Sequence, residues 1–307
     1  MLFEFPTAEA QPGDGLVLGP ALPRWGVDSE YGRLLDVMVS PAPHLEIVPC
    51  NSVAIAALAD GLDCCADAAS VQHAALVAAL EGAGARCHAV SPLRGMPDLS
   101  FTRDTTSMTP WGLLPLAPAV AHRQAEVQHI VDAAREWGVP ILARVSEGCV
   151  EGGDICLLRP GIVVIGYSGE RTDAAGAASL AGLFEARGWE AILYRFDPDF
   201  LHLDTHFTMI DERRALACVD ALSPPFLARM ESLGVELVPV TRDEVRRLGA
   251  NILSLGGGRL VSSLDNGRVN GLLDSLGYQV IRVDVGQFAR CGGGIHCLTM
   301  PLARAAA

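Results

Sequence analysis

Short apolar runs alternate with longer amphipathic stretches from about residue 30 onward. The runs are rich in Val, Ile and Leu and are bounded by turn-forming residues, which is typical of strands. We predict strands over residues 35–39, 141–145, 155–158, 162–165, 206–210, 216–219, 252–255, 260–263 and 280–283. The amphipathic stretches predict helices over residues 68–81, 121–137, 173–187, 224–233 and 269–276.

Tight turns join some of the predicted strands directly, and helices separate most of the others. Arg159-Pro160-Gly161 and Gly256-Gly257-Gly258 each lie between two strands, so both pairs should form hairpins. This order predicts a mixed α/β fold rather than a purely parallel sheet. We expect a single domain over residues 1–307, with residues 1–25 as an irregular segment rich in Pro and Gly.

The charge and hydropathy of the chain narrow the classes of function. A net charge of −13 and a pI of about 5.0, without a basic cluster, exclude nucleic acid as a partner and favour a small cation. No apolar run approaches the roughly 20 residues that cross a bilayer, and no basic-then-apolar start suggests a secretory signal. We therefore expect a cytoplasmic protein without a membrane partner, and a homodimer stays an open option.

The cysteines indicate a reducing compartment. There are nine of them, irregularly spaced, with Cys64 and Cys65 adjacent. No Cys-x-x-Cys pair suggests a zinc or redox site. Most should be buried and inert thiols.

Two acidic segments are candidates for binding a cation. The first is Phe-Thr-Arg-Asp at residues 101–104, which ends in Asp104, and the second is Glu-Gly-Gly-Asp at residues 151–154, which begins with Glu151. Taken alone, Asp104 has an equally ordinary explanation as the cap of a turn. The glycines allow a close backbone approach, but a surface turn with two acids is also common.

Two further segments carry groups suited to catalysis. His202, Asp204 and His206 alternate, so on a strand they would share a face, as metal ligands or as a base beside a carboxylate. The alternative is that the histidines belong to the core. The other segment, residues 292–297, places three glycines before His296 and Cys297. It presents either a reactive thiol or a structural one.

The four segments, in this order, resemble the guanidino-group-modifying superfamily of arginine deiminases, dimethylarginine hydrolases and amidinotransferases. Flanking stretches at residues 28–34, 169–172 and 251–255 are also similar, so the resemblance extends from about residue 26 to residue 302. It implies a five-bladed α/β propeller of ββαβ units, the pentein fold, with pseudo-five-fold symmetry. It also implies chemistry without a metal or another cofactor.

The resemblance assigns catalytic roles to three residues. Cys297 is expected to attack the guanidinium carbon and form an amidino-thioether. His202 is expected to protonate the departing amine and then to activate water, with Glu151 beside it in the catalytic set. Glu151, Asp104 and Asp204 are expected to surround the small cationic guanidino substrate. His206 would then be structural.

Further substrate contacts are expected from four residues. Arg171 matches an arginine that anchors the substrate carboxylate, and the segment His122-Arg123 stands where related deiminases tend to carry two arginines. Arg123, Asn51 and Gly293 complete the expected set. Only about 50 residues separate Asn51 from Phe101, so the helical insertion typical of such deiminases is absent.

Asp204 favours a substrate with unmethylated terminal nitrogens, because a carboxylate there pairs with two amino groups that carry hydrogens. We therefore expect hydrolysis of arginine or a related compound to a ureido product, with release of ammonia. An arginine dihydrolase, a dimethylarginine hydrolase and an amidinotransferase are the alternatives, and Asn51 does not distinguish the first of these from a deiminase. A non-enzymatic binder of a cationic metabolite is the competing class.

Overall fold

The computed structural model describes residues 24–145 and 147–306, in which the strands form five small sheets. The first sheet has the order β14-β1-β2, with β14 at Met300–Arg304, β1 at Leu34–Val39 and β2 at Arg86–Ala89. The second is the pair β3 (Thr106–Thr109) and β4 (Gly112–Pro115). The others are β5 (Ile155–Arg159), β6 (Ile162–Tyr167) and β7 (Glu190–Arg195); β8 (Phe207–Met209), β9 (Arg214–Ala217) and β10 (Glu236–Pro239); and β11 (Leu253–Gly256), β12 (Arg259–Ser263) and β13 (Gln279–Val283).

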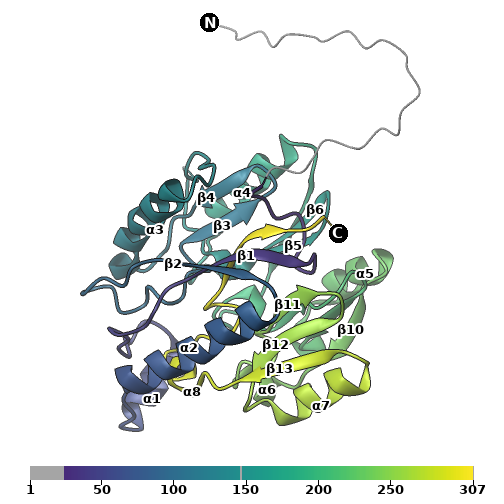
Figure 1. Ribbon diagram of the computed structural model, residues 1–307. Coiled ribbons are helices and arrows are strands. Elements are labelled where there is room, and N and C mark those ends of the chain that lie inside the picture. Colours follow the sequence, from purple (N-terminus) through teal and green to yellow (C-terminus); the bar gives the residue numbers. More distant parts are fainter. Residues whose placement is uncertain (1–23, 146, 307) are drawn as a thin grey trace, which may run out of the picture.

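One pattern recurs in the sheets: an antiparallel pair, a helix, and a third strand parallel to the second. The helices α4 (Ala174–Glu185), α5 (Pro224–Ser232) and α7 (Gly267–Ser275) make this connection in the last three sheets. In the first sheet α2 (Ala66–Gly82) leads from β1 to β2, and β14 supplies the antiparallel partner. Figure 1 shows α3, α5 and α7 at the edge of the molecule. The mixed α/β class is thereby established.

The second sheet departs from this pattern, and the predicted strand 141–145 is wrong. After η1 (Ala121–Arg123) and α3 (Gln124–Glu136), the chain makes a single parallel bridge between Ile141 and Leu113. Leu142 donates to the carbonyl of Leu113, but the ladder stops at Pro115, which has no amide hydrogen to continue it. The carbonyl of Pro115 accepts from the amide of Val145, which is out of register with a regular parallel ladder.

Most of the other predicted elements are confirmed to within a few residues, including both hairpins and all five helices. The predicted strand 216–219 lies too late, since β9 ends at Ala217 and a short helix, η4 (Val219–Ala221), follows. Six strands were not predicted, β2, β3, β4, β7, β10 and β14, nor were α1 (Ser52–Ala59), α6 (Arg242–Val245) and α8 (Gly286–Ala289). Residues 1–23 of the predicted irregular segment lie outside the described residues.

Burial of apolar side chains between each sheet and its helix holds the fold together. Phe184 of α4, Leu76 of α2 and Phe207 of β8 are among the largest fully buried side chains. Each such side chain stabilises the folded state by about 1.5–3 kcal/mol relative to an exposed one. No helix in the described part of the chain is both long enough and apolar enough to span a membrane.

Two distant parts of the chain meet in the first sheet. The yellow strand β14 lies beside the purple β1 in Figure 1, with Met300 opposite Met38. The buried guanidinium of Arg304 donates to the carbonyls of Gly32 (2.6 Å) and Ser254 (2.8 Å). This contact fixes the segment that directly follows Cys297.

We predict that Leu76→Ala lowers the free energy of unfolding by about 2–5 kcal/mol, because it leaves a cavity under α2. The matched control is Val71→Ala on the same helix, where the side chain is 70% exposed. That variant should change the free energy of unfolding by less than about 0.5 kcal/mol. Urea denaturation followed by circular dichroism measures both, and equal losses in the two variants would contradict the packing described here.

Candidate active site

Three of the four segments line one pocket, and the segment 151–154 lies directly behind it. The phenyl ring of Phe101, the carboxylate of Asp104, the imidazole of His202 and the thiol of Cys297 line it together. The remaining lining residues are Cys50, Asn51, Asp98, Arg123, Arg171, Leu201, Cys291, Gly292 and Gly293. Glu151 lies behind His202, and Asp204 lies beside Cys297 facing a smaller adjoining cavity.

Two of the segments form single turns of 3₁₀ helix immediately before a strand. The turn η2 (Gly152–Asp154) precedes β5, and the turn η3 (Leu203–Thr205) precedes β8. Asp154 accepts a hydrogen bond from the amide of Leu203 (2.8 Å) and so joins the two turns. Gly153 lies under the imidazole of His202, and a Cβ there would approach the ring to 2.7 Å. The glycine therefore allows the histidine to reach its position.

The expectation that His202, Asp204 and His206 share one strand face is wrong. A 3₁₀ helix has three residues per turn, so side chains two positions apart diverge. The ring of His206 packs against Phe196 and Phe200, with centroids 5.1 and 4.5 Å away. Burial lowers the pKa of His206 to about 4, which leaves it neutral in the core.

Cys297 lies among polar groups in a fully buried position. Asn251 donates from Nδ2 to the sulfur (3.2 Å), and its Oδ1 accepts from the amide of His296 (3.0 Å). A carboxylate oxygen of Asp204 is 3.7 Å from the sulfur. Burial and the negative charges of Asp204 and Asp104 raise the pKa of the Cys297 thiol well above its usual value. In the free site the sulfur is therefore protonated.

Asp204 is held by a second histidine. Its Oδ2 lies 2.8 Å from Nδ1 of His296, whose Nε2 lies 3.3 Å from Glu30. Burial opposes ionisation of Asp204, but the hydrogen bond and charge of His296 lower its pKa overall. Among the described residues, no hydrogen-bond partner reaches Oδ1 of Asp204. The carboxylate thus keeps one buried acceptor free beside Cys297.

His202 lies between two carboxylates. Its Nε2 is 2.9 Å from Glu151, and its Nδ1 is 3.8 Å from Asp104. Burial alone would lower the pKa of His202, but Asp104, Asp154 and Glu151 together raise it to about 9. The ring is therefore an imidazolium at neutral pH, able to donate a proton.

Two arginines neutralise the carboxylates next to His202. Arg171 donates from Nη1 to Glu151 (3.1 Å) and from Nη2 to the carbonyl of Cys50 (2.7 Å). Burial would raise the pKa of Glu151, but His202 and Arg171 lower it to about 2. Arg123 donates to Asp104 and Glu126. Its other contacts are the carbonyl oxygens of Asp98 and Phe101.

Asn51 and Gly293 fix the loop that leads to Cys297. The side chain of Asn51 accepts from the amide of Ala54 (2.8 Å) as the cap of α1, and donates to the carbonyl of Cys291 (2.9 Å). A Cβ on Gly293 would lie 2.2 Å from the ring of Phe101, so only glycine fits there. Both residues support the pocket wall as well as lining it.

Sequence reasoning did not single out Asn251, His296, Asp98 or Cys50 as site residues. Asn251 and His296 lie within segments already noted for their resemblance, so that signal was available. Asp98 and Cys50 carry no motif of their own. They reach the pocket because the loops before Phe101 and before α1 come together there.

Comparisons with known proteins identify the family. A family model described as "N,N dimethylarginine dimethylhydrolase, eukaryotic" matches residues 56–304. The uncharacterized protein YkgA of Bacillus subtilis is 29% identical over 90% of this chain and 94% of its own. The N(G),N(G)-dimethylarginine dimethylaminohydrolase of Streptomyces coelicolor is 27% identical (80% and 93%). The arginine deiminase of Mycobacterium avium is 32% identical over 68% of this chain, which spans only 61% of that enzyme.

Solved structures share the fold at low identity. The N-terminal domain of ArgZ, a cyanobacterial arginine dihydrolase bound to product, has a TM-score of 0.77 at 18% identity, covering 88% of this chain and 98% of its own. The dimethylarginine dimethylaminohydrolase of Pseudomonas aeruginosa complexed with citrulline has a TM-score of 0.71 at 21% identity (87% and 99%).

The charge of His202 should appear in the pH dependence of stability. Its folded pKa of about 9 lies above the unfolded value near 6.5, so its contribution is complete below pH 6.5 and disappears as the pH rises through 9. We expect the advantage of the wild type over His202→Gln to be larger at pH 6 than at pH 9, by on the order of 1–3 kcal/mol. Urea denaturation at both pH values measures it.

The matched control is His206→Gln, because the pKa of His206 is lowered to about 4. A histidine that stays neutral in the folded protein destabilises it below the unfolded pKa. The stability advantage of the wild type over His206→Gln should therefore be smaller at pH 6 than at pH 9. An advantage over His202→Gln that is equal at pH 6 and pH 9 would show that His202 is not charged in the folded protein.

Proposed function

The chain belongs to the guanidino-group-modifying superfamily, in the N,N dimethylarginine dimethylhydrolase family, and we propose that it hydrolyses an unmethylated guanidino compound such as arginine. It is a hydrolase that acts on carbon–nitrogen bonds of amidines. The products proposed are ammonia and a ureido compound. The observation that carries the choice of substrate is the buried carboxylate of Asp204, whose Oδ2 lies 3.7 Å from the sulfur of Cys297 and whose Oδ1 has no hydrogen-bond partner among the described residues.

Binding of the guanidinium follows from two unpaired carboxylate oxygens. Oδ1 of Asp104 and Oδ1 of Asp204 are both buried without a hydrogen-bond partner among the described residues. A planar guanidinium between them supplies N–H donors to both and neutralises negative charge that the site otherwise keeps desolvated. The cation also removes the main electrostatic obstacle to ionising Cys297, so substrate binding should lower the pKa of its thiol.

The reaction is proposed to proceed in two halves. In the first, Cys297 loses its thiol proton to solvent as the cationic substrate binds, the thiolate attacks the guanidinium carbon, and the imidazolium of His202 gives its proton to the departing amino group. An amidino-thioether on Cys297 and ammonia result. In the second, neutral His202 takes a proton from water and the oxygen attacks the same carbon. The carbon–sulfur bond then breaks, and the remaining hydroxyl proton passes to the sulfur as the ureido carbonyl forms. Glu151 orients His202 through both halves.

The arginines are assigned different tasks. Each of the three guanidinium nitrogens of Arg123 donates to Asp104, Glu126 or the two carbonyl oxygens, so we assign it to holding Asp104 in place. Arg171 lines the pocket and donates to the carboxylate of Glu151 and to the carbonyl of Cys50. It remains the proposed anchor for a substrate carboxylate. Asn51 and Gly293 remain proposed contacts in the wall formed by the glycine-rich loop.

The architecture supports a central site of this kind. We propose that the five sheets are the five blades of the expected propeller, with β14 closing the first blade. Glu151 directly precedes η2, His202 directly precedes η3 and Cys297 lies in the loop before β14, so each proposed catalytic residue lies shortly before a strand.

Hydrolysis of dimethylarginine is the second candidate, because the matching family is described by that activity. In that case a methylated nitrogen would face Asp204 and leave the free oxygen of its carboxylate without a hydrogen-bond donor. Leaving a buried acceptor unpaired in this way costs about 1–3 kcal/mol. The two candidates are therefore separable by kinetics.

We predict that Cys297→Ser abolishes turnover while the thermal unfolding curve stays close to that of the wild type. In the wild type, mass spectrometry after rapid acid quenching should find the amidino adduct on the peptide that contains Cys297. Cys65→Ser, which changes an exposed thiol, is the matched control and should keep full activity. Wild-type rates in Cys297→Ser would disprove the assignment of the nucleophile.

We predict that arginine, or a shorter unmethylated guanidino acid, has a kcat/KM roughly ten- to a hundredfold above that of dimethylarginine. Steady-state assays that quantify ammonia, methylamines and the ureido product measure it and also reveal a second hydrolysis to the free amine. Arg171→Ala should raise KM more than it lowers kcat. If dimethylarginine is the best substrate, the role proposed for Asp204 is wrong.

A further inference from the structure

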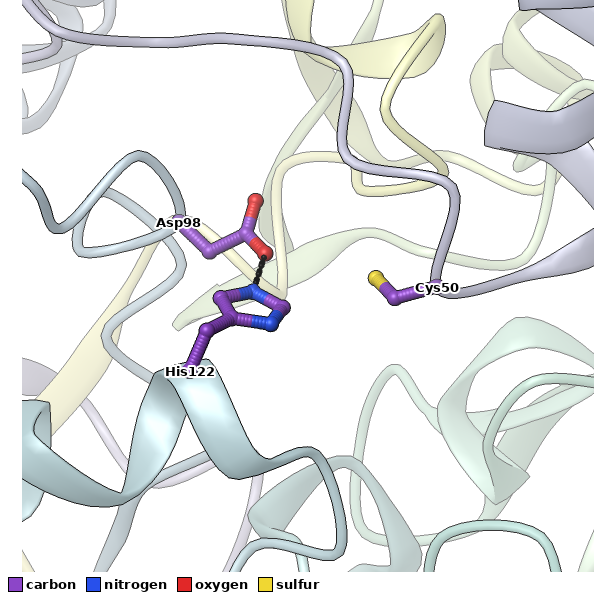
Figure 2. A group of neighbouring side chains, drawn as sticks. All are labelled: Cys50, Asp98 and His122. Atoms are coloured by element: carbon purple, nitrogen blue, oxygen red, sulfur yellow. Dashed lines mark hydrogen bonds and ion pairs between the residues drawn. The ribbon is translucent and has the colours of Figure 1, made fainter.

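A second group of side chains lies at the same pocket but takes no part in the proposed reaction. Figure 2 shows Cys50, Asp98 and His122 facing one another, the first two from loops and His122 from the short helix η1. The thiol sulfur, a carboxylate oxygen and a ring nitrogen all lie within 4.8 Å of one another. Nε2 of His122 is 2.6 Å from Oδ2 of Asp98. The side chain of His122 is 27% exposed, so a solute can reach the group.

We propose that Cys50, Asp98 and His122 form a binding site for a divalent transition-metal ion of the zinc type. Sulfur, imidazole nitrogen and carboxylate oxygen are all common zinc ligands, and three of them leave a fourth position open to water. A thiolate and a carboxylate together carry two negative charges, which balance the charge of the ion. Magnesium and calcium, which prefer oxygen ligands, do not match this set.

The distances require only a small adjustment. Ligand atoms about 2.0–2.3 Å from zinc in a tetrahedron lie roughly 3.5 Å from one another. The spacing of up to 4.8 Å therefore closes slightly around an ion, while the 2.6 Å contact between His122 and Asp98 opens by about an ångström. Asp98 and His122 already point toward each other, so binding replaces one hydrogen bond with two metal bonds.

The surroundings favour an ionised sulfur once the metal is present. Burial and the nearby carboxylate of Asp98 raise the pKa of the Cys50 thiol in the free protein. A metal ion between the two groups converts that repulsion into attraction and deprotonates the thiol. Nη2 of Arg171 lies 3.6 Å from the sulfur and adds a second stabilising contact for the thiolate.

The other compact trio in the described residues is unsuited to a metal. Asp104, Glu151 and His202 are also within 4.8 Å of one another. There, however, Asp104, Asp154 and Glu151 raise the pKa of His202 to about 9, so its ring carries a proton at neutral pH. Both carboxylates are paired with arginines, Asp104 with Arg123 and Glu151 with Arg171. That trio is also fully buried and has no thiol, whereas the Cys50 trio combines a thiol with a partly exposed imidazole.

An ion at this site would obstruct the pocket, since Cys50 and Asp98 line it together with Cys297. Zinc should therefore act as an inhibitor that competes with the guanidino substrate. Exhaustive chelation should leave the rate unchanged or raise it, because the reaction itself uses no metal. The binding measurement below does not depend on turnover, so failure of the proposed function would not affect it.

The test is a titration of metal-free full-length protein with Zn²⁺ against a chromogenic chelator. The wild type should bind one ion tightly. Cys50→Ser and His122→Ala should each weaken binding by more than roughly tenfold, the smallest loss expected even for an outer partner of a metal ion. The matched controls Cys65→Ser, Cys297→Ser and His129→Ala should bind as the wild type does. Unchanged affinity in Cys50→Ser, or its loss in Cys297→Ser, would overturn the proposal.

A measurement on the wild type alone guards against variants that fold poorly. X-ray absorption of the zinc-loaded protein should report one sulfur ligand with the remainder nitrogen and oxygen. The cobalt-substituted protein should show a sulfur-to-metal charge-transfer band that Cys50→Ser lacks. A first coordination sphere without sulfur, or with more than one, would contradict a site made of this trio.

Discussion

Mutual neutralisation of buried charge is the constraint on which the site depends. Charged groups taken out of water are costly unless each one is paired, and the central loops carry acids and bases in alternation. Arg171, Glu151, His202, Asp104 and Arg123 follow one another as cation, anion, cation, anion and cation. For Glu151 and His202 these contacts outweigh burial, so that the pKa of Glu151 falls to about 2 and that of His202 rises to about 9. Burial still raises the pKa of Asp104 above its usual value.

The carboxylate of Asp204 is compensated only in part. It is bonded to His296 on one oxygen, and its charge helps to raise the pKa of the Cys297 thiol beside it. In the proposed reaction, a positive ligand would compensate this charge before Cys297 acts. Binding and activation would then be one event, and compounds without a positive charge should leave the thiol unreactive.

Helices and hairpins were predictable because they depend on local features: apolar periodicity, and turns such as Arg159-Pro160-Gly161. Short strands were missed where their residues are polar although buried, as in β3 (Thr106–Thr109), since neighbours distant in sequence supply the burial. The motif residues Cys297 and His202 do line one pocket, as the resemblance led us to expect. Apart from Glu126, which is three residues along the chain, the partners of Arg123 and those of Asn251 were not predictable, because these contacts join loops that only the tertiary fold brings together.

The pairing of β14 with β1 sets the order in which the molecule can be completed. Four of the sheets are made of strands close together in the sequence, and a growing chain can form them as it leaves the ribosome. The first sheet must wait for residues 300–304, and Cys297 is synthesised only just before them. A nascent chain therefore gains the proposed nucleophile and the third strand of the first sheet almost together. If that role is right, interrupted synthesis would yield chains with most of the fold and none of the reactivity.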